Sequence, residues 1–449
     1  MKKIFLILFL FLIGLRGFAV EIVYPKSKTV TINSPKTFFI GNSDKDFTIN
    51  GQKAERNSKG AFAYVVELHT GENIFEIDDG VEKQIFKITR PEPATETYNT
   101  PAQNTFTDCK AFMTSRDHVP LRSTPVDAGI NRLSHLPLGV VLTVTGEKNG
   151  FYKVFLCENE FAWISKNDVT ALKTNTPANL KGYDYIDNNE YFTFVFHIDK
   201  KVPFIIEEGT VMKLKLYNIE GYSPYIMEFP YSEAAGCDTL YGYGGEFIGN
   251  DFVWKIRKPL NINKKHPLKN IKIAVDAGHG GDELGAISCF GDKEKDINLS
   301  TAKFLQKELE KRGAKVYMTR TEDTYLGLRE RVDKANEAGA VILLSIHGNA
   351  LPDNLDPNTH RGTSIYYYYD MAKPLAESII AEMTCELGLN NDKVRQGSLA
   401  LVRNTNALGI LIEVGYLINP DNSVLLRNED FQKSAAKAIA DGIENFLAK

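Results

Sequence analysis

The sequence predicts several small all-β modules followed by a C-terminal α/β domain, whose twisted and mostly parallel sheet is covered by helices. Three observations support this multidomain fold class. The chain has 449 residues, which is too many for one ordinary domain. Short alternating strands, separated by turns that contain Gly and Asn, fill most of residues 28–256. From residue 271 onward, apolar strands instead alternate with amphipathic helices, which is the pattern of a parallel sheet with helices on both faces.

Residues 1–19 have the form of a secretory signal peptide. Lys2 and Lys3 precede an apolar run at residues 4–15, and small residues suited to cleavage follow at Gly17 and Ala19. The run is too short to be a comfortable transmembrane span, and no later run reaches the length of one. We therefore expect a secreted or periplasmic protein without a transmembrane segment.

The composition restricts the partners and the cross-links. The formal net charge is -4, which is too small to indicate nucleic acid or an acidic membrane surface as a partner. The chain has five cysteines, an odd number that leaves at least one of them unpaired. Cys109 and Cys157 fall in one β-rich segment and could form a disulfide, but their spacing does not decide the question.

The first module is expected at residues 20–90. Its short strands, with Asn50 and Gly51 at one of the turns, predict a β-sandwich that resembles bacterial immunoglobulin-like modules. We expect these strands at residues 28–32, 37–40, 47–49, 61–67, 73–77 and 83–88. A polar stretch rich in Pro and Thr follows at residues 91–107 and is predicted to be a linker.

Two more β modules are expected before the α/β domain. Residues 108–175 resemble a bacterial SH3-like domain, a family whose members commonly bind cell-wall peptides. Tyr152 and Trp163 are its candidate binding aromatics, although core packing is the favoured interpretation for Trp163. Residues 176–265 contain further alternating strands and resemble β-sandwich modules that bind the bacterial envelope, so we expect an envelope-binding module there.

The α/β domain is expected at residues 266–449. Helical spacing of apolar residues and a final Gly313 define its first helix, at residues 297–312. The other elements follow in order: a strand at 315–318, a helix at 328–338, strands at 340–346 and 363–369, a helix at 372–387, a turn at 388–397, strands at 399–402 and 408–414, and a helix at 431–447.

Chemically active side chains stand at the ends of three strands and at the start of a helix. His279, His347 and Glu413 each follow or end an apolar strand, and Glu294 lies in a loop before the first helix. Open α/β sheets bind their ligands at the carboxyl ends of the strands. A catalytic zinc site needs three nitrogen or oxygen ligands, an open position for water and a free carboxylate as base. Two histidines and two glutamates match this requirement.

Six segments of this domain resemble, in order, the zinc-dependent N-acetylmuramoyl-L-alanine amidases of the type 3 family. The segments are residues 275–281, 293–299, 316–320, 328–336, 345–349 and 411–420. These enzymes cut peptidoglycan between muramic acid and the L-alanine of the stem peptide. The resemblance implies a peptidoglycan hydrolase associated with the cell wall, with Zn2+ as its cofactor. It also implies His279, Glu294 and His347 as zinc ligands and Glu413 as the catalytic general base.

The roles of neighbouring residues stay open. Asp276 and Ser345 are candidates for hydrogen bonds to the two ligand imidazoles. Arg320, Arg331 and Arg403 could bind the carboxylates of the stem peptide, or they could form structural ion pairs.

Two other functions are compatible with the same residues: a zinc peptidase that cuts elsewhere in the stem peptide, and a non-catalytic protein that binds the cell wall. The presence of all four site residues favours an enzyme. His347 and Glu413 are 66 positions apart, and the expected elements fill that interval without room for an additional helix over the site. We therefore expect that no activator protein is required.

Overall fold

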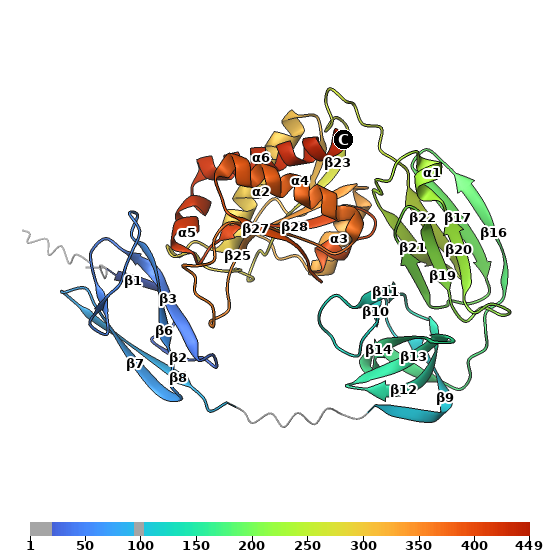
Figure 1. The fold of residues 1–449 in the computed structure, drawn as a ribbon, viewed down its shortest axis with the longest axis horizontal. Helices are drawn as coiled ribbons and strands as arrows, with labels where there is room; N and C mark the ends of the chain where they lie inside the picture. Colours follow the sequence, from blue (N-terminus) through green and yellow to red (C-terminus); the bar gives the residue numbers. More distant parts are fainter. Residues whose placement is uncertain (1–19, 94–102) are drawn as a thin grey trace, which may run out of the picture.

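The computed structural model describes residues 20–93 and 103–449. The predicted signal peptide and part of the predicted linker lie outside the described residues. Figure 1 shows the α/β domain in the middle, with one β-sandwich on one side of it and two further β bodies on the other. None of the helices in the described ranges is both long and apolar enough to span a membrane.

The first β-sandwich encloses a core that includes Phe39, Phe62, Ile77 and Ile88. One sheet has the strand order β1-β3-β6, and the other has the order β2-β8-β7-β4-β5. The expected strands are all present, and β1 and β5 are additional. Their bounds are β1 Val20–Tyr24, β2 Thr29–Thr31, β3 Lys36–Ser43, β4 Thr48–Ile49, β5 Gln52–Lys53, β6 Ala61–Glu67, β7 Gly71–Asp78 and β8 Lys83–Arg90.

The second β body is a single seven-stranded sheet with the order β11-β10-β14-β13-β12-β9-β15. Its first strand begins at Asn104, inside the segment that was expected to be a linker. Trp163 is buried, as the core-packing interpretation requires. The bounds are β9 Asn104–Thr114, β10 Val119–Arg122, β11 Arg132–Leu136, β12 Val141–Lys148, β13 Phe151–Cys157, β14 Glu160–Ser165, η1 Lys166–Asp168 and β15 Val169–Leu172.

The one disulfide that the sequence left open, between Cys109 and Cys157, is not formed in the structure. Cys109 and Cys157 are both free, and so are the other three cysteines.

The third β body stacks a four-stranded sheet, β16-β17-β22-β21, on a three-stranded sheet, β18-β19-β20. Aromatic side chains such as Phe194, Phe196 and Trp254 fill the space between them. The bounds are β16 Leu180–Asp187, β17 Tyr191–Ile198, β18 Phe204–Glu207, β19 Met212–Leu216, β20 Tyr225–Phe229, α1 Tyr231–Ala235, β21 Tyr243–Ile248 and β22 Asp251–Arg257.

The α/β domain has a six-stranded sheet with the order β24-β23-β25-β28-β26-β27. All neighbouring pairs are parallel except β26 and β28, so the expectation of a mostly parallel sheet is confirmed. The bounds are β23 Lys272–Ala277, α2 Glu294–Lys311, β24 Lys315–Met318, α3 Leu328–Glu337, β25 Ile342–Asn349, β26 Thr363–Tyr367, η2 Asp370–Ala372, α4 Lys373–Leu387, β27 Asn391–Gln396, η3 Leu401–Arg403, β28 Leu408–Tyr416, α5 Pro420–Leu426 and α6 Glu429–Leu447.

Helices cover both faces of this sheet. Successive strand residues point to opposite faces, so each face has its own apolar side chains for the helices to cover. Ile273 and Val275 belong to a core shared with α2, α4 and α6. Ala274 and Leu343 face the other way, toward α3 and η3. This two-sided burial explains the nearly continuous apolar runs in β23, β25 and β28. It also brings the carboxyl ends of these three strands to one edge of the sheet.

Two expectations for the region after α4 are wrong. The segment expected to be a turn, residues 388–397, contains the polar edge strand β27, which pairs only with β26 and therefore lacks an apolar pattern. The strand expected at residues 399–402 is instead the short helix η3, whose apolar Leu401 and Val402 are buried. Helix α5 was not anticipated, although Asn419 caps it and Pro420 begins it.

Candidate metal and catalytic site

His279 lies just beyond the end of β23, in a backbone conformation that arginine side chains hold. Its φ is 61°, a left-handed value that a non-glycine residue adopts only when its surroundings fix it. Arg331 donates from Nη2 to the His279 carbonyl at 2.9 Å and from Nη1 to the Ala277 carbonyl at 2.8 Å. Arg320 donates from Nε to the same Ala277 carbonyl at 2.8 Å. The end of β23 is thereby fixed, and with it the position of the imidazole.

His347 reaches the site from β25, the strand beside β23. Asp276 pairs with Ser345 in the parallel register, so His347 lies next to the turn that follows β23. Its ring packs against Gly278 so closely that a Cβ atom at that position would collide with the imidazole. The glycine before His279 is therefore required to admit the second histidine.

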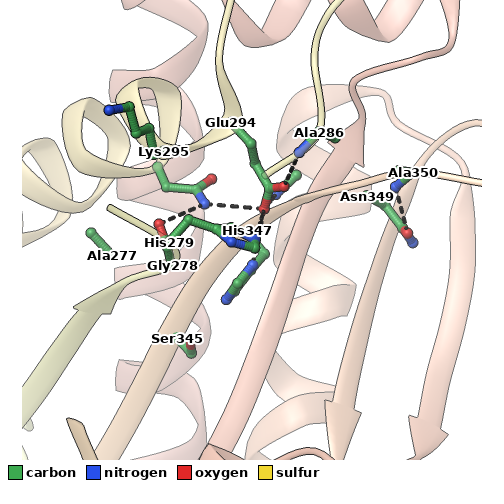
Figure 2. Close-up of polar contacts among 12 residues, drawn as sticks. Ala277, Gly278, His279, Ala286, Glu294, Lys295, Ser345, His347, Asn349 and Ala350 are labelled. Atoms are coloured by element: carbon green, nitrogen blue, oxygen red, sulfur yellow. Dashed lines mark hydrogen bonds and ion pairs between the residues drawn. The ribbon is translucent and has the colours of Figure 1, made fainter. Parts of the chain in front are cut away.

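Glu294 is the first residue of α2, and its carboxylate lies between the two imidazoles. Oε1 is 2.9 Å from Nδ1 of His347 and 3.2 Å from Nε2 of His279. Figure 2 shows Glu294 directed from the start of the helix toward both histidines. One potential ligand atom from each of these three residues lies within 4.8 Å of the others. The structure thus brings together the three residues that the sequence predicted to be ligands.

Backbone and side-chain donors orient the Glu294 carboxylate. The Ala286 amide donates to Oε2 at 2.8 Å, and the Gly348 amide donates to Oε1 at 3.2 Å. Asn298, one helical turn further along α2, donates from Nδ2 to Oε1 at 3.2 Å and to the Gly278 carbonyl at 3.3 Å. A carboxylate held by this many donors keeps one orientation toward the histidines.

The electrostatics differ between the two glutamates. Burial acts to raise the pKa of Glu294, but its contacts with His279 and His347 outweigh burial and hold the pKa below the usual range, so this carboxyl is ionised. Burial raises the pKa of Glu413 to about 7; the nearby His347 opposes this shift and Glu294 adds to it. Two carboxylates in one site therefore have different proton affinities.

Glu413 stands in β28 directly beside His347 in the strand register. Its Oε2 is buried and has no hydrogen-bond partner. Buried polar atoms are nearly always paired, so an unpaired carboxylate oxygen beside three potential ligands is the pattern of a group that acts on a substrate or water.

The candidate helper residues Asp276 and Ser345 form their hydrogen bonds with each other and with residues other than the two histidines. Asp276 accepts hydrogen bonds from Ser345 Oγ at 2.7 Å and Thr319 Oγ1 at 2.6 Å, and it forms a buried ion pair with Arg331 at 2.9 Å. Asp276 and Ser345 were candidates for hydrogen bonds to the imidazoles, and their side chains are instead bonded as described.

Two of the arginines considered as stem-peptide ligands, Arg320 and Arg331, are structural, and for Arg403 both roles stay open. Arg320 and Arg331 are buried, and their guanidinium groups are occupied by backbone carbonyls of the His279 turn. Arg403 donates to the Ser398 carbonyl. The structural ion-pair alternative is correct for Arg331, because a buried Asp276 carboxylate needs a cation.

Sequence reasoning missed Asn298 and Gly285 as supports of the site. Asn298 could have been found from its position four residues after Glu294 on the same helix face. Gly285 has φ 69°, and a Cβ there would meet the Glu294 carboxylate and lie 2.8 Å from Cδ2 of His279. No local pattern marks that glycine, because its neighbours in space come from elsewhere in the chain.

Comparison with known proteins identifies the domain. Residues 273–445 match the family model described as N-acetylmuramoyl-L-alanine amidase. The probable cell wall amidase LytH of Staphylococcus aureus is 35% identical over 190 residues, which cover 42% of this chain and 62% of LytH. The solved amidase AmiC2 of Nostoc punctiforme is 30% identical, with 42% of this chain and 100% of that chain covered and a TM-score of 0.38. The catalytic domain of the amidase CwlV, from Bacillus (Paenibacillus) polymyxa var. colistinus, is 33% identical, with 39% of this chain and 98% of that chain covered and a TM-score of 0.37.

The chain therefore contains a domain of the N-acetylmuramoyl-L-alanine amidase family, at residues 273–445. The matched residues of the amidase domain run from β23 to α6 and include all four site residues. The three β bodies lie outside the match, so the SH3-like and envelope-binding assignments stay predictions. The chain spans 62% of the length of the curated amidase relative that it matches.

The donor set of this amidase domain fits a zinc ion. Two imidazoles and a carboxylate form a common ligand set of catalytic zinc sites. In the structure an ionised carboxylate oxygen lies within hydrogen-bond distance of both histidines, which is a close gathering of three ligand-bearing groups. Cys289, five residues before Glu294, is not part of this group, because its thiol is buried beside the Phe62 and Ile418 carbonyls.

Proposed function

We propose that this protein is a zinc-dependent N-acetylmuramoyl-L-alanine amidase, which hydrolyses the amide bond between muramic acid and the L-alanine of the stem peptide in peptidoglycan. Family membership supports the reaction class. The observation that carries the proposal is the buried, unpartnered Oε2 of the half-buried Glu413 side chain, beside the cluster of His279, Glu294 and His347. A wall-binding protein without activity has no need for such a group.

His279, Glu294 and His347 would hold the zinc ion. When bound, zinc supplies Lewis acidity that activates water and polarises the scissile carbonyl. Asn298 and the amides of Ala286 and Gly348 keep Glu294 turned toward the histidines, and Gly278 admits the His347 ring. These contacts fix the site before substrate arrives, which lowers the reorganisation that the reaction needs.

Glu413 is proposed to move the proton. Its unpartnered Oε2 takes a proton from the attacking water and returns it to the nitrogen of the departing L-alanine, so that the C–N bond breaks as a neutral amine forms. A pKa of about 7, raised by burial, suits a group that must accept and then release a proton near neutral pH. Arg320 and Arg331 hold backbone carbonyls of the turn that carries His279, and Asp276 pairs with Arg331.

The alternative of a zinc peptidase differs in the bond that is cut. Purified muropeptides should therefore be digested with the zinc-loaded protein and analysed by mass spectrometry. Free stem peptides that begin with intact L-alanine, together with peptide-free glycan, are the expected products. Shortened stem peptides still attached to muramic acid would identify a peptidase, and unchanged muropeptides would identify a non-catalytic wall protein.

The proposed substrate places the protein outside the cytoplasm. Peptidoglycan is assembled beyond the inner membrane, which is consistent with the predicted signal peptide at residues 1–19 and with a secreted or periplasmic, wall-associated location. Fractionation of cells, with detection of a mature chain that lacks these residues, tests this part of the proposal.

A further inference from the structure

The first β-sandwich has one face covered by the α/β domain. In β3 and β6, alternate residues point into the sandwich core, and the residues between them should face solvent. Those intervening residues are nevertheless buried: Phe38, Ile40, Ala61 and Ala63 are 4%, 1%, 0% and 9% exposed. They form an apolar cluster with residues of the α/β domain, namely Cys289, Phe290, Leu351, Ile418 and Val424. Figure 1 shows β3 and β6 on the side of the sandwich nearest that domain.

Polar contacts give this interface a defined geometry. Asp353, in the loop after β25, accepts hydrogen bonds from the Tyr24 hydroxyl at 2.6 Å and the Thr37 hydroxyl at 2.8 Å. Asn57 donates to the Pro420 carbonyl at 3.0 Å, and Asn358 donates to the Ala63 carbonyl at 3.1 Å. Hydrogen bonds to a carboxylate are stronger than neutral ones, so Asp353 is the main polar anchor.

One line of contacts leads from the interface to Glu294 through the turn before α2. Cys289 stands near the tip of this turn, is fully buried, and accepts from Asn42 Nδ2 on its carbonyl at 3.2 Å. Below the tip, Ile287 and Lys293 form a β-bridge that closes the turn. At its base, the Ala286 amide donates to the Glu294 carboxylate. The sandwich therefore holds the tip of the turn whose base orients Glu294.

A second line of contacts leads from the interface to Glu294 through the segment after β28. Ile418 is in the interface, and the adjacent Leu417 donates its amide to the Asn349 carbonyl at 2.9 Å. The Leu417 side chain packs on Gly348, where a Cβ would lie 2.9 Å from Cδ1 of the leucine. Gly348 is the second backbone donor to Glu294. Both backbone amides that orient this carboxylate thus belong to segments that adjoin the sandwich.

We propose that the β-sandwich of residues 20–90 is a positioning element of the catalytic centre. Through Cys289 and Ile418 it holds the two segments that orient Glu294, so release of the sandwich loosens the site although no sandwich residue touches substrate. The predicted effect on hydrolysis rests on the proposed amidase function. The effect on the two loops does not depend on it.

The test compares interface and control variants of the full chain. Ile40→Asp and Ala63→Glu each place a charge in the apolar interface, on two different strands, without entering the sandwich core. Ile40→Val keeps the apolar contact and serves as the conservative variant. Ile74→Asp adds the same charge to β7, where the side chain is 53% exposed, and serves as the matched control.

Each variant is characterised by three measurements. Alkylation of Cys289, read by peptide mass spectrometry, reports release of the sandwich, because burial raises the pKa of this thiol to about 12 and keeps it unreactive while docked. Hydrogen exchange at residues 284–293 and 349–361 reports loop order. The turnover number and KM for a soluble muropeptide report catalysis.

In Ile40→Asp and Ala63→Glu we expect Cys289 to become alkylated, both loops to exchange faster, and the turnover number to fall at least about tenfold because misplaced catalytic groups are costly. Ile40→Val and Ile74→Asp should match the unchanged protein. Alkylation of Cys289 with unchanged loop exchange and turnover would overturn the proposal, as would undisturbed Cys289 in both charged variants. Loop loosening in a protein that never hydrolyses muropeptides would support the positioning role and reject the amidase function.

Discussion

Glu413 and His347 are register partners in the adjacent parallel strands β28 and β25, so both side chains leave the sheet on the same side. The register explains how the proposed base and a proposed metal ligand, from segments far apart in sequence, come to lie side by side. It also means that the proposed base is placed by a strand of the sheet rather than by a loop.

The first prediction concerns Glu413 directly. Glu413→Gln keeps the size of the side chain but removes its ability to accept a proton, so we expect normal zinc content and at least a ~10²-fold loss in the rate of muropeptide hydrolysis. Zinc is measured by atomic spectroscopy and hydrolysis by chromatography. Near-normal turnover in this variant would exclude Glu413 as the general base.

Asn298 should matter through Glu294. Asn298→Ala removes one donor to the Glu294 carboxylate, and we expect zinc affinity or turnover to fall about 10- to 100-fold, the usual effect of removing a support of a metal ligand. Gln306→Ala, on the same helix and partly exposed, is the matched control. Zinc affinity is measured by competition with a chelating dye. If the two variants have equal zinc affinity and equal turnover, Asn298 does not orient Glu294.

The next prediction concerns the lack of space for a side chain at Gly278. A Cβ at this position would collide with the His347 imidazole, so Gly278→Ala should displace that ring and greatly weaken zinc binding while leaving most of the sheet folded. Gly327→Ala is the control, because nothing lies within 4 Å of a Cβ there and its φ of -63° suits any residue. Calorimetric titration measures the zinc affinity of the two variants. Equally tight zinc binding by Gly278→Ala and Gly327→Ala would contradict the prediction.

The gathering of the candidate site residues was largely predictable from sequence, whereas their supports were not. His279, Glu294, His347 and Glu413 could be chosen because each sits where an apolar strand or helix begins or ends, a local pattern. The pairing of Asp276 with Arg331 could not be predicted from the sequence. A buried ion pair between a strand and a helix depends on which way each side chain points in the folded domain.

The same limit explains the error at the sheet edge and why the sequence did not reveal the interface of the sandwich. Strand β27 is polar because only one neighbour pairs with it, so its sequence looks like a turn. The outward residues of β3 are apolar because a second body covers them, and the sequence alone does not say whether such residues face a partner or complete the core.

Arg331 gives a prediction about stability. It pairs with Asp276, and the two side chains are 2% and 1% exposed, so Arg331→Ala leaves a buried carboxylate without its cation. Loss of one partner of a buried pair typically costs about 3–5 kcal/mol of unfolding free energy. The exposed pair of Arg329 with Asp333 is the control, and Arg329→Ala should cost less than about 1 kcal/mol. Urea denaturation measures both; equal midpoints would show that the buried pair contributes little.

The last prediction concerns regulation. Between His347 and Glu413 the structure contains β26, η2, α4, β27 and η3, and α4 packs on α6 and the sheet rather than over the site. Within the described residues, the interval holds only the short helices η2 and η3 besides α4, so no second long helix is present there that could lie over the site.

The loop at residues 350–362 is the remaining local candidate for a lid. It is held by the sandwich, because Asp353 accepts from Tyr24 and Thr37 and Asn358 donates to the Ala63 carbonyl. A loop fixed at two points by a neighbouring body is poorly suited to swing over the zinc and away again. We therefore expect zinc-loaded full-length protein to hydrolyse muropeptides without any second protein.

The assay uses the full chain because removal of residues 20–90 would expose the apolar interface around Cys289 and Ile418. Turnover is measured with purified protein and soluble muropeptides, with Glu413→Gln as the negative control for contaminating hydrolases. If the purified zinc-loaded chain is inactive and gains activity only when a cell-envelope extract is added, with no gain for Glu413→Gln, an activator is required and the argument from the His347–Glu413 interval fails.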